Sequence, residues 1–226
     1  MDGTRYLWLS FQTASYGLLL AMLLGIPLGI LLSNRKVTGR DLLDVAITVP
    51  MVLPPTVLGY YLLVLMGRGT WVDRAWHNIT GGPIVFSFAG CVVAAAVAAL
   101  PFVVKSTRTA LEEIDEGLLA AAATLGAGAW RRLWTVRFPL ALRGIAAGCM
   151  LGFARAIGDF GATLMIGGNI PGRTRTAALA VYDLMLRGED GAAAGLALAL
   201  CALSVFLLLG ANIGLKCHHS KGGGRE

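Results

Sequence analysis

Residues 111–145 of this 226-residue chain have the sequence LEEIDEGLLAAAATLGAGAWRRLWTVRFPLALRGI and separate two long apolar segments. The stretch contains four consecutive alanines, then Gly126, nine further residues, and Val136-Arg137-Phe138-Pro139. Alanine and leucine favour helix, and alanine methyl groups form a thin rod that fits a groove on a partner. Gly126 and Gly128 permit a sharp turn. The pattern predicts a docking helix outside the bilayer, with a helix lying on lipid headgroups as the alternative.

The composition of the whole chain is that of a membrane protein. Charged residues make up 14% and apolar residues 56%, whereas soluble domains have roughly 25% charged residues. A helix needs about 20 apolar residues to cross a bilayer core, and five segments reach this length. The fold class is therefore predicted to be all-α, a polytopic membrane bundle that forms a single domain over residues 1–226. The predicted spans are 10–32, 42–66, 84–104, 145–166 and 191–215.

A sixth apolar segment is shorter than these five. Residues 174–187, TRTAALAVYDLMLR, are too short to cross the bilayer as a helix. They are predicted to form a helix that dips into the outer leaflet, so the number of spans is five or six.

Lysine and arginine accumulate in short cytoplasmic loops, and they are unevenly distributed here. Twelve follow the first and third predicted spans or end the chain, and six lie on the other side. This asymmetry predicts an outer N-terminus, an inner C-terminus and a cytoplasmic loop at about 105–143. It also explains the net charge of +6 without nucleic acid as a partner. The larger group is Arg35, Lys36, Arg40, Lys105, Arg108, Arg131, Arg132, Arg137, Arg143, Lys216, Lys221 and Arg225, and the smaller is Arg5, Arg68, Arg74, Arg173, Arg175 and Arg187.

Glycines spaced four residues apart recur within the predicted spans. In lipid, small residues at this spacing let helix backbones approach closely. Five such pairs predict a compact bundle that also packs against a second copy of the chain. The pairs are Gly25 with Gly29, Gly144 with Gly148, Gly148 with Gly152, Gly191 with Gly195, and Gly210 with Gly214.

The chain lacks the sequence motifs of an enzyme. It contains no G-x4-G-K-[ST] phosphate loop, no G-x-S-x-G and no H-E-x-x-H. Cys217, His218 and His219 lie in a glycine-rich tail and are predicted to be solvated, not to bind a metal. No catalytic residue, metal site or cofactor is expected in this chain.

The alanine run and the residues after it resemble the cytoplasmic loop through which permeases of ABC importers contact their ATPase. That loop has the pattern E-A-A-x3-G-x9-I-x-L-P in the family, and Ala120 stands where the family usually has Glu. The residues that match, and that the resemblance makes the expected ATPase contacts, are Ala120, Ala121, Ala122, Gly126, Val136, Phe138 and Pro139.

Further segments along nearly the whole chain resemble the molybdate permeases of ABC importers. Two residues depart from that family: Asp159 stands where Glu is common, and Arg173 where an acidic residue is expected. Sulfate permeases share the general plan and are the near alternative. The segments are PMVLPPTVLGY at 50–60, MGR at 66–68, FSF at 86–88, GFARAIGDFGA at 152–162 and NIPGRTRT at 169–176.

The resemblance implies the permease fold of a type I ABC importer in the cell membrane of a bacterium or archaeon. Two copies of the chain would form the pathway for molybdate, with tungstate and sulfate as alternative anions. The implied partners are a cytoplasmic ATPase, which binds ATP and Mg, and an external molybdate-binding protein. Two other classes stay open: an ion-coupled secondary transporter, expected to show intramembrane ionisable residues and an inverted repeat, and a membrane protein without transport activity.

Two pairs of charged residues are candidate sites outside the loop. Arg155 and Asp159 lie one helical turn apart in the fourth predicted span, so they can pair with each other or line the translocation path. Arg173 and Arg175 lie on the predicted external side. There they are candidates for docking the binding protein or for steering an anion.

Overall fold

The computed structural model of the chain describes residues 3–34 and 37–220, with side chains as far as Leu209. All regular structure in these ranges is helical, which confirms the predicted all-α class. The elements are α1 (Gly3–Ser33), α2 (Arg40–Val52), α3 (Pro55–Met66), α4 (Trp71–Thr80), α5 (Phe88–Glu112), α6 (Glu116–Thr124), α7 (Ala129–Arg132), the π-helix η1 (Leu133–Arg137), α8 (Phe138–Ile157), α9 (Gly161–Gly167), α10 (Ala177–Leu186) and α11 (Asp190–Ser220).

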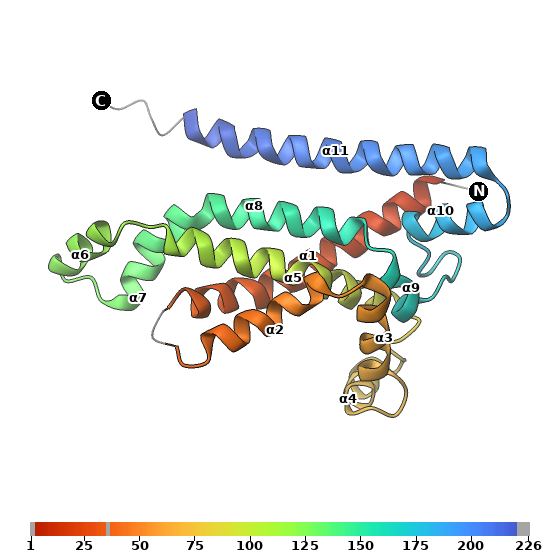
Figure 1. The fold of residues 1–226 in the computed structure, drawn as a ribbon, viewed down its shortest axis with the longest axis horizontal. Coiled ribbons are helices and arrows are strands. Elements are labelled where there is room, and N and C mark those ends of the chain that lie inside the picture. The colour runs from red at the N-terminus through yellow and green to blue at the C-terminus, as the bar shows by residue number, and fades with distance from the viewer. Residues whose placement is uncertain (1–2, 35–36, 221–226) are drawn as a thin grey trace.

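The centre of the bundle is α5, which packs between α1 and α8 (Figure 1). In the most apolar part of each helix, 56% of the residues of α5 are buried, against 28% in α1 and 11% in α11. Helices α1, α5 and α8 therefore form the core, and most of α11 faces outward.

Three of the predicted glycine pairs pack α1 and α8 closely onto α5: Gly25 with Gly29, Gly144 with Gly148, and Gly148 with Gly152. A Cβ atom on Gly29 would lie 2.6 Å from Cβ of Thr107, and one on Gly148 would overlap Ser106. Close approach of backbones is the use that small residues have in membrane helices. Gly191 and Gly195 have no such neighbour within 4 Å in the described chain. Gly210 and Gly214 lie beyond the residues whose side chains are described.

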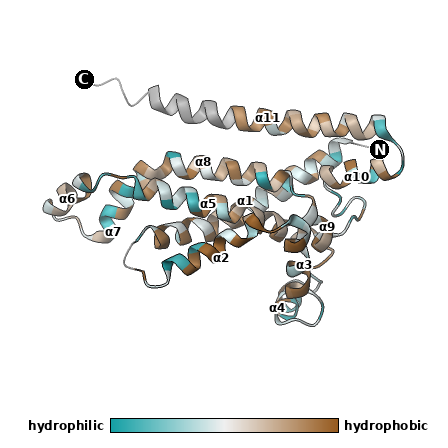
Figure 2. Cartoon of the chain, in the orientation of Figure 1, coloured by the Kyte–Doolittle hydropathy of each residue, from teal (hydrophilic) through white to brown (hydrophobic). Residues whose placement is uncertain are grey.

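Four segments of the described chain are long and apolar enough to cross a membrane. They are Gly3–Ser33, Phe88–Glu112, Ala129–Ile157 and Asp190–Leu209, and the pair α2 and α3 is a fifth if it counts as one broken span. The short apolar segment at 174–187 contains the ten-residue helix α10. These helices consist mostly of apolar residues (Figure 2), and many of their large apolar side chains are exposed.

The span predicted at 42–66 is broken into two helices. Helices α2 and α3 meet at an angle of 115°. Leu53 and Pro54 are extended there, with ψ angles of 140° and 136°. A residue that precedes proline disfavours the helical conformation, and Pro54-Pro55 imposes that restriction on two successive residues. By contrast, α1 and α5 run on through Pro27 and Pro101.

The predicted boundaries of the fourth span are also wrong. The membrane helix covers Ala129–Ile157, starting well before residue 145, and residues 161–167 form the separate helix α9. The helix ends because Asp159 bonds the first turn of α9: its Oδ2 accepts hydrogen bonds from the backbone N–H and the hydroxyl of Thr163, both at 2.9 Å. Much of the loop predicted at 105–143 is therefore helical, and α6 with its flanking turns is the part that leaves the bundle.

Candidate functional site

Helix α6 projects from one end of the bundle, opposite the N-terminal ends of α1 and α11 (Figure 1). Asp115 caps it, since its Oδ1 accepts a hydrogen bond of 2.7 Å from the backbone N–H of Gly117. None of the residues of α6 is buried: Ala120 and Ala121 are exposed, and Ala122 is half-buried. A short apolar helix with no buried face leaves its alanine surface available to a partner.

Gly126 ends α6 in a conformation that glycine favours. Its φ angle is +80°, in the left-handed region that costs other residues roughly 1–2 kcal/mol. The N–H of Gly126 bonds the carbonyl of Ala123 and that of Ala127 bonds the carbonyl of Ala122, both at 3.0 Å. These are the two hydrogen bonds of a Schellman motif. The glycine predicted at the turn therefore fixes the direction in which the chain leaves the alanine surface.

Two arginines attach the returning helix to the segment before it. Nη2 of Arg137 donates to the carbonyl of Leu111 at 3.1 Å, and Nη1 of Arg132 donates to the carbonyl of Leu119 at 3.4 Å. Leu111 lies near the end of α5, and Leu119 lies within α6. Arg132 thus joins α7 to α6, and Arg137 joins η1 to the end of α5.

The remaining predicted contact residues lie in this returning helix. Val136 is half-buried in η1, and Phe138 packs against Leu111 and Ile145. Pro139 lies in the first turn of α8. Proline lacks the N–H that would bond the carbonyl four residues earlier. The five residues before Phe138 form the π-helix η1, and Ala129–Ile157 is one candidate membrane span.

An aromatic stripe runs along the same helix. The ring centroids of Trp130 and Trp134 are 5.6 Å apart, and those of Trp134 and Phe138 are 5.0 Å apart. Trp130 is 72% exposed. Tryptophan is enriched at membrane interfaces, which is where the end of a membrane-spanning helix is expected to lie.

A group of ion pairs at this end attaches α2 to α5. Arg108 bonds both Glu112 and Asp44 at 3.0 Å, and Arg40 pairs with Glu112. Lys105 adds a longer contact of 3.8 Å to Asp44. Sequence reasoning counted these basic residues only as loop charges and missed the group. The spacing of Arg108 and Glu112 on one helix was the one local indication of it.

At the far end of α8, Arg155 and Asp159 form the contact that their spacing predicts. Nη1 of Arg155 lies 3.1 Å from Oδ1 of Asp159, and the carboxylate is fully buried. The pair does not lie within one helix, because Asp159 belongs to the break that leads to α9. It therefore connects two helices.

Arg175, a predicted docking residue, is held inside the chain by its own partners. It is 6% exposed, its Nη1 lies 2.8 Å from Oδ2 of Asp183, and its Nε lies 2.8 Å from Oδ1 of Asn169. The carboxylate of Asp183 also accepts from Arg187 at 2.8 Å. A guanidinium held by these partners has a structural role: it joins the 169–176 segment to α10.

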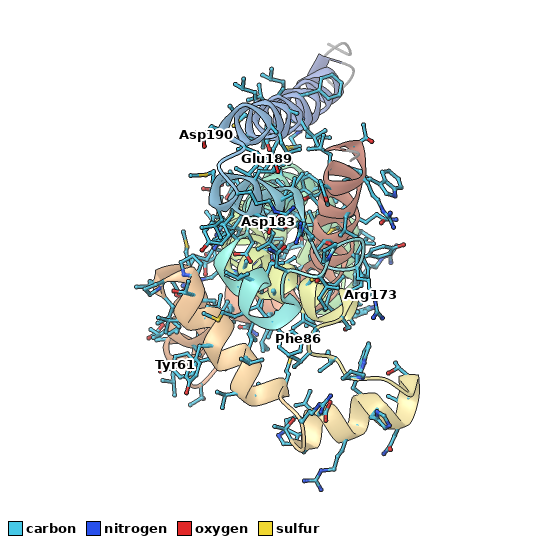
Figure 3. All side chains as sticks on the ribbon, turned by 90° about the vertical axis from the view of Figure 1, so that its right-hand side faces the viewer. Tyr61, Phe86, Arg173, Asp183, Glu189 and Asp190 are labelled. Carbon is cyan, nitrogen blue, oxygen red and sulfur yellow. The ribbon has the colours of Figure 1, made fainter. Side chains whose placement is uncertain are left out.

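Arg173 is exposed, as a docking residue needs to be. It lies at the end of the bundle opposite α6 (Figure 3). It lines a cavity of about 650 Å³ together with Arg68, Asp73 and Phe86. Among the described residues, Arg173 has no ion-pair partner, so its charge is available to solvent or to a partner.

Helix α6 thus presents an exposed alanine surface at one end of a bundle of apolar helices. Residues 25–213 match the family described as binding-protein-dependent transport system inner membrane component, and the chain belongs to this family. Its members are permease components of ABC importers, so the chain is not itself the ATP-hydrolysing enzyme. Within the family, the chain is homologous to the molybdenum permeases.

Several relatives carry this assignment. The molybdenum transport system permease protein ModB of Escherichia coli K12 is 43% identical, with 89% of this chain and 86% of that protein aligned. The putative molybdenum transport system permease protein YvgM of Bacillus subtilis is 34% identical, with 88% of each chain covered. A probable sulfate transport system permease protein of Chlorokybus atmophyticus is 31% identical, over 90% of this chain and 71% of that one.

Solved structures show the same fold. A chain of the MetNI methionine ABC transporter superposes with a TM-score of 0.75 at 17% identity, covering 95% of this chain and 94% of that chain. A chain of a bacterial alginate ABC importer gives a TM-score of 0.69 at 14% identity, covering 96% and 80%. The predicted importer permease fold is confirmed, and the alternatives of a secondary transporter and of a membrane protein without transport are set aside.

Proposed function

We propose that this chain is the permease subunit of an ATP-driven molybdate importer, that two copies form the pathway, and that a separate ATPase contacts α6. The observation that carries the coupling role is that α6 is capped, ends in an ordered Gly126 turn and yet buries none of its own residues. The molybdenum permeases among the relatives support the substrate.

Coupling is expected to work through the attachments of α6. ATP and Mg bind on the ATPase, and the movement of that partner displaces α6. Because Arg132 and Arg137 tie the returning helix to Leu119 and Leu111, α5 and α8 are displaced together with α6. Both belong to the core of the bundle, so the displacement reaches the opposite end.

The orientation follows from this role. The end with α6 faces the cytoplasm, the N-terminus lies outside, and the C-terminus lies inside. The binding protein is then expected to dock at the end that carries Arg173. A membrane-impermeant maleimide tests this: in intact cells it should label a cysteine at position 173 and spare one at the exposed Leu125, and the reverse pattern would refute the orientation.

Transport itself is tested in proteoliposomes that contain the chain, its ATPase and its binding protein. We expect ATP-dependent uptake of labelled molybdate, with tungstate and sulfate as competitors. Uptake of sulfate in preference to molybdate would favour the second candidate function, a sulfate permease, to which the Chlorokybus relative points. Failure of the ATPase to co-purify with the chain would contradict the coupling proposal.

A further inference from the structure

Helix α4 is a short amphipathic helix outside the core of the bundle. Thr70 caps its start by accepting from the N–H of Asp73 at 3.2 Å, and Gly81 ends it with φ +74° while donating to the carbonyl of His77 at 2.8 Å. Its ends are thus defined by its own sequence. The helix is a distinct element of ten residues, much too short to cross a bilayer.

The helix has three different sides. Trp76 packs against the protein, beside the core residues Leu58 and Leu62. Trp71 and Ile79 are apolar and 75% and 82% exposed, and their spacing of eight residues places both on one stripe with Ala75. Charged and polar side chains occupy the remaining side: Asp73, Arg74, His77 and Asn78.

Helix α4 lies across the long axis of the bundle. In Figure 1 it is viewed nearly end-on, and in Figure 3, after a turn of 90°, it is viewed from the side. The membrane-spanning helices run along that long axis. The axis of α4 is therefore nearly parallel to the plane of the membrane, and only seven residues separate α4 from the first turn of α5.

Basic groups adjoin the exposed apolar stripe. Arg68, Arg74 and His77 line a cavity of about 420 Å³ next to α4, with Asp73 as the one acidic lining residue. Arg68 has no ion-pair partner among the described residues. Tryptophan next to basic residues suits the boundary between acyl chains and phosphates, where amphipathic helices lie in the plane of the interface.

We propose that α4 is an interfacial helix: Trp71, Ala75 and Ile79 enter the acyl chains of the outer leaflet, and Arg68 and Arg74 contact lipid phosphates. It would hold the α3–α4 hairpin, which leaves the bundle at the 115° bend, at a fixed depth. The choice of the outer leaflet rests on the proposed orientation of the chain. The location of α4 at the interface does not, so it can be tested without a transport assay.

Electron paramagnetic resonance on spin-labelled single cysteines in nanodiscs tests the proposal. Ile79→Cys carries the label on the apolar stripe, and His77→Cys, on the opposite side of the same helix, is the matched control. The background replaces Cys201, which is exposed, and also Cys217 by alanine. The same protein without an added cysteine measures residual labelling of Cys91 and Cys149. We expect oxygen to relax the label at position 79 more than a polar nickel complex does, and the opposite order at position 77.

Other results would overturn the proposal. If the nickel complex reaches both positions freely, α4 lies in water. If position 79 is open to water until the binding protein is added and is then shielded, the stripe is a docking surface for that protein. If position 79 is closed to both relaxation agents from the start, the second copy of the chain covers it.

Discussion

Arg155 and Asp159 lie on either side of the end of α8, and Nη1 of the arginine is 3.1 Å from Oδ1 of the carboxylate. The other oxygen of Asp159 accepts from the backbone N–H and the hydroxyl of Thr163 in α9. A single buried carboxylate thus joins α8 to α9. Because α9 packs in turn on α3, the position of α3 also depends on this connection.

Replacing Asp159 by asparagine leaves Arg155 without its counter-charge. Loss of one partner of a buried pair costs about 3–5 kcal/mol, and partial exposure of Arg155 lowers the expected loss to about 1–3 kcal/mol. Thermal unfolding should therefore shift downward for Asp159→Asn. Combining it with Arg155→Gln should recover much of the loss, because no unpaired charge remains.

A matched control for this variant is Arg187→Gln, which removes an i,i+4 ion pair whose arginine side chain is 52% exposed. Its effect should be small, about 0–1 kcal/mol. Uptake measurements on the stable double variant add a second result: loss of transport with retained stability would mean that Arg155 contacts the passing anion. Unchanged stability and uptake for Asp159→Asn would refute the connecting role.

Arg173 and Arg175 are expected to respond differently to substitution. Arg175→Ala removes a buried guanidinium from Asp183 and Asn169. Because Asp183 keeps Arg187, we expect a loss of stability of about 1–3 kcal/mol. Arg173→Ala should leave thermal unfolding unchanged, since this side chain is exposed and makes no ion pair with the described residues.

Arg173→Ala should instead slow association of the loaded binding protein, and the effect should be largest at low salt. Surface plasmon resonance at two ionic strengths measures the on-rate. An on-rate equal to that of the unaltered chain at both salts would remove Arg173 from the docking surface.

Local sequence patterns predicted several features of the structure. The lengths of the apolar segments identified the long spans, and the position of Gly126 identified the turn. Both features depend on the local sequence alone. The i,i+4 spacing of Arg155 and Asp159 predicted their contact. These features depend on neighbours close in the chain.

Features that depend on distant segments were missed. Arg175 looked like a loop cation because its partner Asp183 lies on the next helix, and nothing in the spacing indicates that the chain folds back onto it. The contacts of Arg40 and Arg108 with Glu112 and Asp44 depend on how α2 packs on α5. The end of the fourth span at Gly158 was missed because apolar residues continue across the break into α9.

The contact between α5 and α8 gives a third prediction. A Cβ atom on Gly148 would overlap Ser106 and lie 3.0 Å from the carbonyl oxygen of Phe102, so Gly148→Ala forces the two helices apart. Overpacking of this kind costs about 1–3 kcal/mol, measured by thermal unfolding.

Gly195→Ala is the matched control, because no atom lies within 4 Å of the Cβ it would add. Alanine has the better helix propensity by about 1 kcal/mol, so this variant should be neutral or slightly more stable. Equal effects of the two substitutions would contradict the close packing of α8 on α5.

The last prediction separates the shape of the docking loop from its surface. Gly126 has φ +80° and no atom within 4 Å of an added Cβ, so backbone conformation, and not space, limits what can replace it. Asparagine tolerates the left-handed region, whereas a β-branched residue does not. Gly126→Asn should therefore keep most of the ATPase stimulation, and Gly126→Val should lose it.

Ala121→Glu alters the exposed surface without touching the turn. A bulky charge on the alanine face should weaken ATPase binding, about tenfold for every 1.4 kcal/mol lost, while membrane insertion and thermal unfolding stay unchanged, because the side chain at 121 buries nothing within the chain. Co-purification of the ATPase and stimulated hydrolysis measure the effect. If Ala121→Glu and Gly126→Val both kept the stimulation of the unaltered chain, α6 would not be the ATPase contact, and the coupling surface would have to be sought elsewhere at this end of the bundle.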